Sequence, residues 1–241
     1  MFDRLSRELN GFLDLLFPAA CPLCYQTLPS SEPSAFCSSC RISFTPLPSG
    51  ICSRCTLPFP SSNSSAHLCE SCSRSLPPYL SVAAVGVYEA GLRKAVHRFK
   101  YEGGHDLDRP LGVLLFDKIK SAPIPDLVVP VPLHKYRLRE RSYNQSLLLA
   151  RELGDHLSCP VSTDLLQRVR DTPQQQGLRA RERARNLRGA FDCRRTLTGE
   201  RVLLVDDVMT TGATAAVCSQ ILLDAGASDV RVAVVGRAGR G

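Results

Sequence analysis

The chain has 241 residues, of which 44% are hydrophobic and 22% charged, and its formal net charge is +7. This composition is typical of a globular protein, and the length suffices for one sizeable core and a smaller module besides. No run of about 18 apolar residues is present, so we expect no transmembrane helix. The basic residues are 25 arginines and 5 lysines, a bias that suits bidentate contacts with phosphate but also follows from genome composition alone.

Residues 1–17 are predicted to form an amphipathic helix. Three acidic residues within them argue against a lipoprotein-type export signal. We expect the helix to dock on its own protein, with a partner or a membrane surface as the alternatives, and we expect a cytoplasmic protein without stable membrane insertion. The apolar positions recur at helical spacing and are Leu5, Leu9, Phe12, Leu13 and Leu16.

Residues 18–76 hold eight of the eleven cysteines, arranged as four C-x-x-C pairs. Two thiolates three positions apart can bind one ion from a single turn, and two such turns complete a tetrahedral site. The alternatives are disulfides, which a reducing cytosol disfavours, and a redox site, which needs only one such pair. The predicted ligands of structural Zn²⁺ are Cys21, Cys24, Cys37, Cys40, Cys52, Cys55, Cys69 and Cys72.

This Cys-rich module contains few large apolar residues, so metal binding is expected to supply much of its folding free energy. The spacing leaves the pairing open, because sequential and interleaved arrangements both satisfy it. His67 is close enough to Cys69 to replace a cysteine ligand. The isolated Cys159, Cys193 and Cys218 are expected to be small buried hydrophobic residues.

Residues 79–241 alternate apolar strands with helical patterns, which predicts an α/β domain with a mainly parallel sheet covered by helices on both faces. Ligands of such sheets bind at the carboxyl ends of the strands. Strands are expected at residues 81–88, 126–132, 161–169, 201–207 and 230–236, and helices at 91–101, 107–120, 144–157 and 213–226.

The stretch VLLVDDVMTTGAT, residues 202–214, carries the clearest site signal. Asp206 and Asp207 are expected to end a buried strand, and a turn leads directly into a helix whose first N–H groups lack intrahelical partners. Hydroxyls and a glycine at such a helix start can hold a phosphate, and the carboxylates can accept two ribose hydroxyls. The alternative is a capped turn without a ligand. The predicted phosphate-binding residues are Thr210, Thr211, Gly212, Ala213 and Thr214.

These residues resemble the signature of type I phosphoribosyltransferases, which bind 5-phosphoribosyl 1-pyrophosphate (PRPP). With the Cys-rich module and the segments HRFKYEGGHDLDRPLG, VVPVPLHKYRLRERSYNQS and RVRDTPQQQGLRARERARNLRGAF, the chain is similar to the ComF family, competence-associated proteins involved in DNA uptake. The resemblance spans residues 21 to about 236. It implies that Asp206 and Asp207 act in catalysis by holding the ribose hydroxyls, that residues 210–214 bind the 5-phosphate, and that residues 132–135 form the pyrophosphate loop. It also implies DNA-uptake helicase or channel proteins as partners.

The segment after VVPVP leads to the same assignment without the family. It brings basic groups to the carboxyl edge of the sheet, where they can meet a diphosphate through a bridging Mg²⁺. The alternative is a solvated basic helix start. The candidates are Leu133, His134, Lys135 and Arg137 for PRPP, and Arg139 and Arg141 for the diphosphate or for DNA.

Residues 168–195 contain nine arginines and only three acidic residues, and therefore carry most of the net positive charge. Their first part lacks apolar periodicity, which indicates a mobile loop. Such a loop can close over a diphosphate, lie along single-stranded DNA, or be merely solvated. Arg179, Arg181 and Arg183 are the main candidates for DNA contact.

Two hypotheses remain open on the sequence alone. The first is an enzyme that transfers a phosphoribosyl group from PRPP to a nitrogen acceptor, with Mg²⁺ and basic loops stabilising the leaving pyrophosphate. The second is a non-enzymatic single-stranded DNA-binding competence factor that keeps the PRPP pocket as a sensor or relic. The chain ends shortly after its last predicted strand, so residues 79–110 are expected to cover the acceptor, whose identity the sequence leaves open.

Overall fold

The computed structural model describes residues 19–28, 35–59, 67–170, 187 and 189–239. The helix predicted at residues 1–17 lies outside these ranges, as do Arg179, Arg181 and Arg183.

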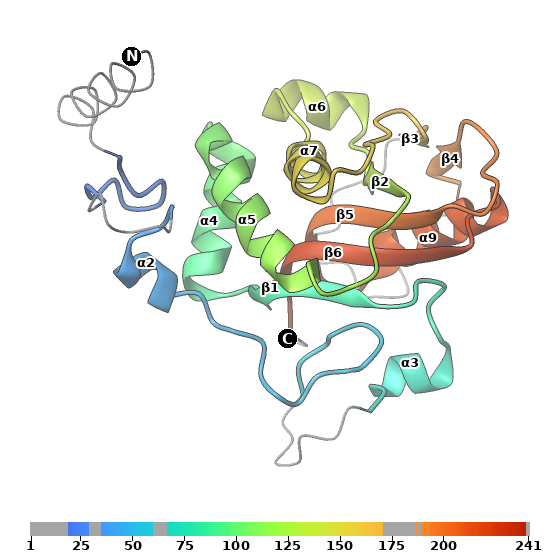
Figure 1. Ribbon diagram of the computed structural model, residues 1–241, viewed down its shortest axis with the longest axis horizontal. Helices are drawn as coiled ribbons and strands as arrows, with labels where there is room; N and C mark the ends of the chain where they lie inside the picture. The colour runs from blue at the N-terminus through green and yellow to red at the C-terminus, as the bar shows by residue number, and fades with distance from the viewer. Residues whose placement is uncertain (1–18, 29–34, 60–66, 171–186, 188, 240–241) are drawn as a thin grey trace, which may run out of the picture.

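A four-stranded parallel sheet forms the centre of the larger domain (Figure 1). The strands follow the order β1-β6-β5-β2, and each neighbouring pair runs parallel. Their residues are mainly apolar and many are β-branched, which suits strands buried on both faces. The bounds are Val82–Val87 for β1, Leu127–Pro130 for β2, Arg201–Met209 for β5 and Asp229–Arg237 for β6.

Alternate residues of β5 enter the cores on opposite faces of the sheet. Val202 and Leu204 pack in one core with helix α9, whereas Leu203 and Val205 pack in the other with α4, α5 and α7. This alternation follows from the two-residue period of a strand. The predicted α/β fold with helices on both faces is therefore confirmed. The bounds are Ala90–Tyr101 for α4, Asp108–Ile119 for α5, Gln145–Leu157 for α7 and Ala213–Asp224 for α9, and a 3₁₀ turn spans His105–Leu107.

The strand predicted over residues 161–169 is shorter and lies in a different sheet. Strand β3 (Leu166–Arg168) pairs antiparallel with β4 (Phe191–Cys193). Val161 makes only an isolated parallel bridge with Val128 of β2. A bend over residues 163–165 then turns the chain away, in keeping with the preference of Ser, Thr and Asp for turns.

The basic segment after β2 contains a helix, α6 (Lys135–Arg141). Lys, Arg, Leu and Glu are good helix formers, so the charges do not prevent it. The helix ends at Ser142, whose φ of 65° lies in the left-handed region. Helix α7 then begins after Asn144, whose side chain accepts the N–H of Ser146 at 3.1 Å.

The two halves of the Cys-rich module dock on different faces of the sheet (Figure 1). The first half, with α2 (Ser38–Ile42), shares a core with α4 and α5, and the second, with α3 (Glu70–Arg74), shares a core with α9. The connecting chain runs against β1, where the N–H of Val87 donates to the carbonyl of Thr45 at 2.9 Å. Glycine is required at Gly86, because a Cβ there would lie 2.3 Å from the same carbonyl oxygen.

Candidate functional site

Asp206 and Asp207 lie at the carboxyl edge of the sheet, but within β5 and not at its end. Strand β2 pairs with β5 only as far as Pro130 and Val205, whereas β6 continues to pair with β5 through Met209. Strand β5 is therefore longer than predicted, because its last residues continue to pair with β6. The two aspartates stand beside the end of β2, where the sheet opens on that side.

Side chains from two helices contact the acidic pair. The Nζ of Lys100, near the end of α4, lies 2.7 Å from Oδ1 of Asp207. The hydroxyl of Ser146, in the first turn of α7, donates to Oδ1 of Asp206 at 3.0 Å. The backbone N–H of Asp207 donates to the same oxygen at 2.9 Å. Helices α4 and α7 thus meet β5 at this one pair of carboxylates.

Burial and mutual repulsion determine the charge of this pair. Burial raises the pKa of Asp206 to about 7, and the charge of Asp207 adds to the rise. For Lys100, burial acts to lower the pKa, but the carboxylates of Asp207 and Asp206 outweigh it, so the pKa is raised. Lys100 is therefore protonated at neutral pH and compensates the carboxylate of Asp207, while Asp206 titrates near neutrality.

A cavity of about 300 Å³, here called the acidic cavity, opens beside the acidic pair. It brings together residues from the acidic strand, from the basic segment after β2 and from the start of α9, three parts of the chain whose site residues were predicted separately. Arginines and hydroxyls around two carboxylates suit a ligand with both phosphates and sugar hydroxyls. The predicted residues that line it are Leu133, Arg137, Arg141, Asp206, Asp207, Thr210 and Thr214.

The remaining predicted residues of the basic segment do not line this cavity. His134 is buried, with its ring centroid 5.1 Å from that of Tyr136. The Nζ of Lys135 lies over the same tyrosine ring, 5.7 Å from its centroid. Arg139 is exposed on α6.

Residues 210–214, here called the TTGAT loop, have a second side. Thr211, Gly212 and Ala213 line another cavity, of about 670 Å³, between this loop and the second half of the Cys-rich module. Gly212 precedes α9 with a φ of 81°, in the left-handed region that favours glycine. A Cβ at this position would lie 3.2 Å from the hydroxyl of Tyr79. The predicted helix start with a glycine in the turn is therefore present.

Five residues with polar side chains line the acidic cavity but were not singled out from the sequence as PRPP ligands. Lys100 belongs to the last turn of a predicted helix, where a lysine is equally expected as a partner of the helix dipole. Ser146 sits in the first turn of another helix, where serine is common in any protein. Their role depends on which helix ends meet at the sheet, and no local signal carries that. The five are Tyr88, Lys100, Tyr101, Ser146 and Arg168.

The eight paired cysteines gather into two groups of four. The first two C-x-x-C pairs form one group and the last two form the other. Within each group the four sulfur atoms all lie within 4.8 Å of one another. Tetrahedral Zn–S bonds of about 2.3 Å place neighbouring sulfurs roughly 3.8 Å apart, so both groups fit the ion. His67 instead packs its ring against Phe59, with the ring centroids 4.2 Å apart. The groups are Cys21, Cys24, Cys37 and Cys40, the first cluster, and Cys52, Cys55, Cys69 and Cys72, the second cluster.

Backbone N–H groups stabilise thiolates in both clusters. The N–H of Cys40 donates to the sulfur of Cys37 at 3.5 Å, and that of Cys69 donates to the sulfur of Cys52 at 3.3 Å. Burial alone would raise the pKa of Cys52, but N–H donors, with Cys69 foremost, lower it to about 6. A cysteine ligand must be deprotonated, so this geometry favours metal binding. Of the isolated cysteines, Cys159 and Cys218 are buried as predicted, whereas Cys193 is only half-buried.

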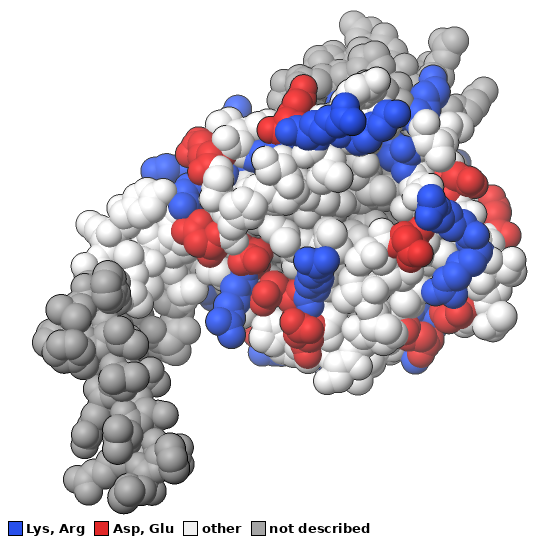
Figure 2. Space-filling view, turned by 90° about the horizontal axis from the view of Figure 1, so that it is seen from above, with Lys and Arg blue, Asp and Glu red and all other residues white. Residues whose placement is uncertain are grey.

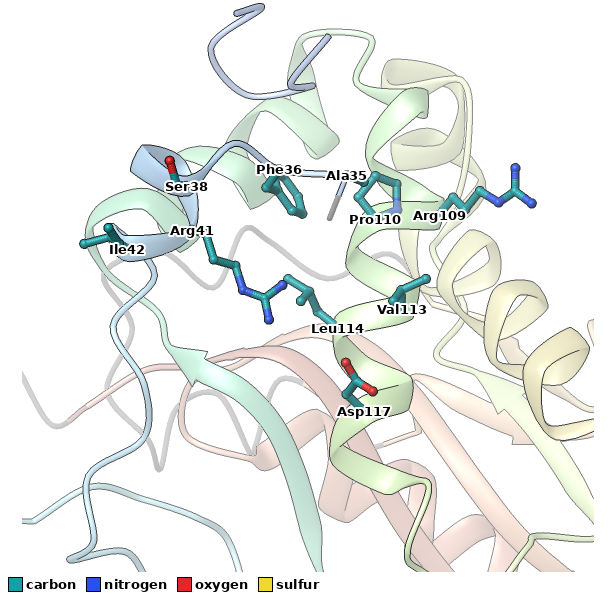
Figure 3. Close-up of a pocket in the computed structure, with 10 residues that line it drawn as sticks. All are labelled: Ala35, Phe36, Ser38, Arg41, Ile42, Arg109, Pro110, Val113, Leu114 and Asp117. Atoms are coloured by element: carbon teal, nitrogen blue, oxygen red, sulfur yellow. The ribbon is translucent and has the colours of Figure 1, made fainter. Parts of the chain in front are cut away.

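A third cavity, of about 650 Å³, lies between α2 and α5 (Figure 3). Its lining includes Phe36, Pro110 and Leu114, and among the described residues it contains no predicted site residue. This cavity lies between the first half of the Cys-rich module and the larger domain, and it is separate from the acidic pair.

Family models match both parts of the chain. Residues 12–73 match the double zinc ribbon domain, and residues 144–241 match the phosphoribosyl transferase domain. The fold and the sites therefore define a double zinc ribbon followed by a phosphoribosyltransferase-like domain. No helix in the described part of the chain is long and apolar enough to span a membrane.

Relatives identify the family more closely. DNA utilization protein YhgH of Salmonella typhi is 34% identical over 224 residues, which cover 90% of this chain and 96% of the relative. Competence protein F of Haemophilus influenzae is 31% identical over 221 residues, which cover 84% and 96%. The chain belongs to the ComF family. Among solved structures, a purine phosphoribosyltransferase from Pyrococcus horikoshii is 20% identical with a TM-score of 0.33, covering 52% of this chain and 68% of that one.

Protein purified without chelator is expected to hold two zinc ions per chain, because each four-sulfur cluster makes one tetrahedral site. Elemental analysis by mass spectrometry measures the content directly. Cys40→Ser and Cys69→Ser should each lower it by about one ion, since they open different clusters. Negligible zinc together with disulfide-linked peptides would contradict the assignment.

The free energy of unfolding is expected to fall as the pH rises from about 6 to 8, by on the order of 1 kcal/mol more than in Asp206→Asn. The pKa of Asp206 is raised in the folded protein to about 7, so its contribution is fully present below the unfolded pKa and is lost as the pH rises through the folded one. Urea titrations at each pH measure the difference. Parallel pH profiles for the two proteins would mean that Asp206 is ionised throughout.

Proposed function

We propose that the acidic cavity binds PRPP and that the protein, with Mg²⁺, transfers the phosphoribosyl group to a nitrogen acceptor in a process linked to DNA uptake. One observation carries this proposal. Asp206, Asp207, Thr210 and Thr214 line the same cavity as two arginines of α6, the combination that a ribose with phosphates at both ends requires.

Each part of the cavity suits one part of PRPP. The TTGAT loop at the start of α9 would hold the 5-phosphate through hydroxyls and N–H groups. Asp206 and Asp207 would accept hydrogen bonds from the two ribose hydroxyls. Leu133, Arg137 and Arg141, which line the same cavity, would face the diphosphate, and a Mg²⁺ bound with PRPP would neutralise part of its charge.

The chemistry needs positioning and charge more than a protein nucleophile. The bond between C1 of the ribose and the pyrophosphate oxygen breaks, and pyrophosphate leaves with the electron pair. The acceptor nitrogen forms the new bond to C1 and loses a proton. Positive charge develops on the ribose as the old bond breaks, so carboxylates near the sugar and arginines near the leaving group both stabilise the transition state.

Lys100 has a defined part in this arrangement. In the structure its ammonium group compensates Asp207, and it reaches the pair from α4, within the residues expected to cover the acceptor. Tyr88 and Tyr101, which also line the cavity, come from the same part of the chain. The acceptor would therefore bind beside Lys100, against aromatic rings that suit a planar nitrogen heterocycle.

The link to DNA uptake rests on the relatives. Their names refer to DNA utilization and to competence. By this kinship, we propose that a product of the site or the protein itself serves DNA uptake, and that helicase or channel proteins of that process are its partners.

The variant Asp206→Asn/Asp207→Asn is expected to bind PRPP with Mg²⁺ at least tenfold more weakly than the wild type, because each substitution replaces a charged acceptor for a ribose hydroxyl by a neutral amide, at a cost of about 1 kcal/mol or more. Calorimetry measures the affinity, and circular dichroism confirms folding. The control is Asp117→Asn, an exposed aspartate that pairs with Lys120 on α5. Equal affinities in all three folded proteins would place PRPP elsewhere.

A second candidate function, single-stranded DNA binding, is favoured by two aromatic residues near the cavity. Tyr101 and Tyr136 are each 52% exposed. The guanidinium of Arg141 lies 4.9 Å from the ring centroid of Tyr101, and Lys135 lies over Tyr136. Exposed aromatic rings beside cations are typical of surfaces on which bases stack. Figure 2 also shows basic side chains gathered along one rim of a face whose other charges are mixed.

Single-stranded DNA is expected to bind with an affinity that falls as salt is added, because arginines displace counterions from phosphates. Replacing Arg179, Arg181 and Arg183 together with Ala should flatten the slope of log affinity against log salt by about 2, at roughly 0.7 for each phosphate contact. Fluorescence anisotropy measures the slope. Displacement of the DNA by saturating PRPP with Mg²⁺ would indicate overlapping sites, and an absence of binding at low salt would rule out direct DNA binding.

A further inference from the structure

Arg237, the last residue of β6, connects the second cysteine cluster to the TTGAT loop. The residue is only 2% exposed. Its Nε donates to the carbonyl of Cys55 at 2.8 Å, and one terminal nitrogen lies 3.8 Å from the sulfur of the same cysteine. The other terminal nitrogen donates to the carbonyls of Met209, at 3.1 Å, and of Thr210. One guanidinium thus contacts a predicted zinc ligand and the entrance to the loop.

These hydrogen bonds orient the peptide groups of the loop. A trans peptide points its C=O and its N–H in opposite directions, and no cis peptide is present among the described residues. Carbonyls of Met209 and Thr210 that face Arg237 therefore turn the N–H groups of Thr210 and Thr211 away from it. N–H groups held in fixed directions are what a phosphate-binding loop needs.

The second cluster also gives Arg237 an electrostatic partner. The guanidinium is always charged, and its hydrogen bonds go to carbonyl groups and to the sulfur of Cys55, with no carboxylate among them. A buried charge of this kind is costly without a counter-charge. Four thiolates around one Zn²⁺ carry a net negative charge, so a metal-loaded second cluster stabilises Arg237 in this position.

The first cluster has a different connection. Arg98 of α4 is 8% exposed and donates to the carbonyl of Pro22, next to Cys21. Its counter-charge is Asp106, with both carboxylate oxygens 3.0 Å away. Arg98 is thus compensated within the larger domain, and it connects the first cluster to α4 and not to the TTGAT loop. Of the two clusters, the second is the one tied to the loop.

We propose that Arg237 is a positioning residue through which the second zinc site holds the TTGAT loop in its phosphate-binding form. Loss of metal from the second cluster then releases the loop, whereas loss from the first cluster does not. The inference rests on the proposed function, since phosphate binding is what the loop would serve, but its structural part can be measured without any ligand.

The first test replaces Arg237 with Lys and, separately, with Gln. We expect zinc content to stay near two ions, amide hydrogen exchange across residues 209–214 to accelerate, and affinities for ribose 5-phosphate and PRPP to fall about tenfold. The matched control is Arg54→Lys. Arg54 lies in the same half of the module and donates to the carbonyl of Pro77 at 3.0 Å, so this variant should change neither exchange nor affinity.

The second test compares Cys69→Ser with Cys40→Ser and holds even if the Arg237 variants do not fold. Both should lose about one zinc ion, but only Cys69→Ser should accelerate exchange across residues 209–214. Unchanged exchange in zinc-loaded Arg237 variants, or equal acceleration by the two cysteine variants, would overturn the proposal. If the wild type binds no PRPP while exchange responds as expected, the proposed function fails and the connection between metal site and loop stands.

Discussion

Two adjacent carboxylates in a largely buried strand are stable only when a cation lies beside them, and Lys100 provides it here. The ion pair with Asp207 spans 2.7 Å between two mostly buried side chains. Removing one partner of such a pair leaves a buried charge uncompensated, a loss of roughly 3–5 kcal/mol. The ion pair therefore fixes the end of α4 beside the acidic pair. Its neighbour Phe99 strengthens this arrangement, because its carbonyl accepts hydrogen bonds from Tyr143 and Gln145 beside the start of α7.

The Cys-rich module reaches both sides of this arrangement. Arg98 stands two residues before Lys100 on α4 and joins that helix to the first half of the module. Arg237, the last residue of β6, joins the TTGAT loop to the second half. The module shares its apolar residues with the cores of the larger domain. Metal binding in the module thus stabilises the helix that carries the counter-ion and the loop that would hold phosphate.

The regular features of the fold were predictable because they depend on local patterns. Apolar strands identified the parallel sheet, and the C-x-x-C pairs identified the eight cysteines that form the clusters. Asp206 and Asp207 do share a cavity with Thr210 and Thr214. The pairing of cysteines and the antiparallel β3–β4 sheet were not predictable, since they depend on which segments meet in space. Lys100, Ser146 and Arg237 belong to the same group: each sits at an ordinary position of a helix or strand and gains its role from a residue distant in sequence. The buried Arg237, for example, donates a hydrogen bond to Cys55, which lies 182 positions earlier in the chain.

The charges of the cavity distinguish its interior from its rim. The cavity is lined by two carboxylates and by four cations, which are Lys100, Arg137, Arg141 and Arg168. This surplus of positive charge suits any ligand with phosphates, whether a sugar phosphate or a DNA backbone. The two carboxylates distinguish a sugar phosphate from a DNA backbone. Carboxylates repel phosphates but accept hydrogen bonds from hydroxyl groups, and the vicinal hydroxyls of a ribose are donors that deoxyribose in DNA lacks. Under the proposed function, the interior would therefore favour a ribose phosphate over DNA, while the exposed rings of Tyr101 and Tyr136 would leave the rim suited to bases.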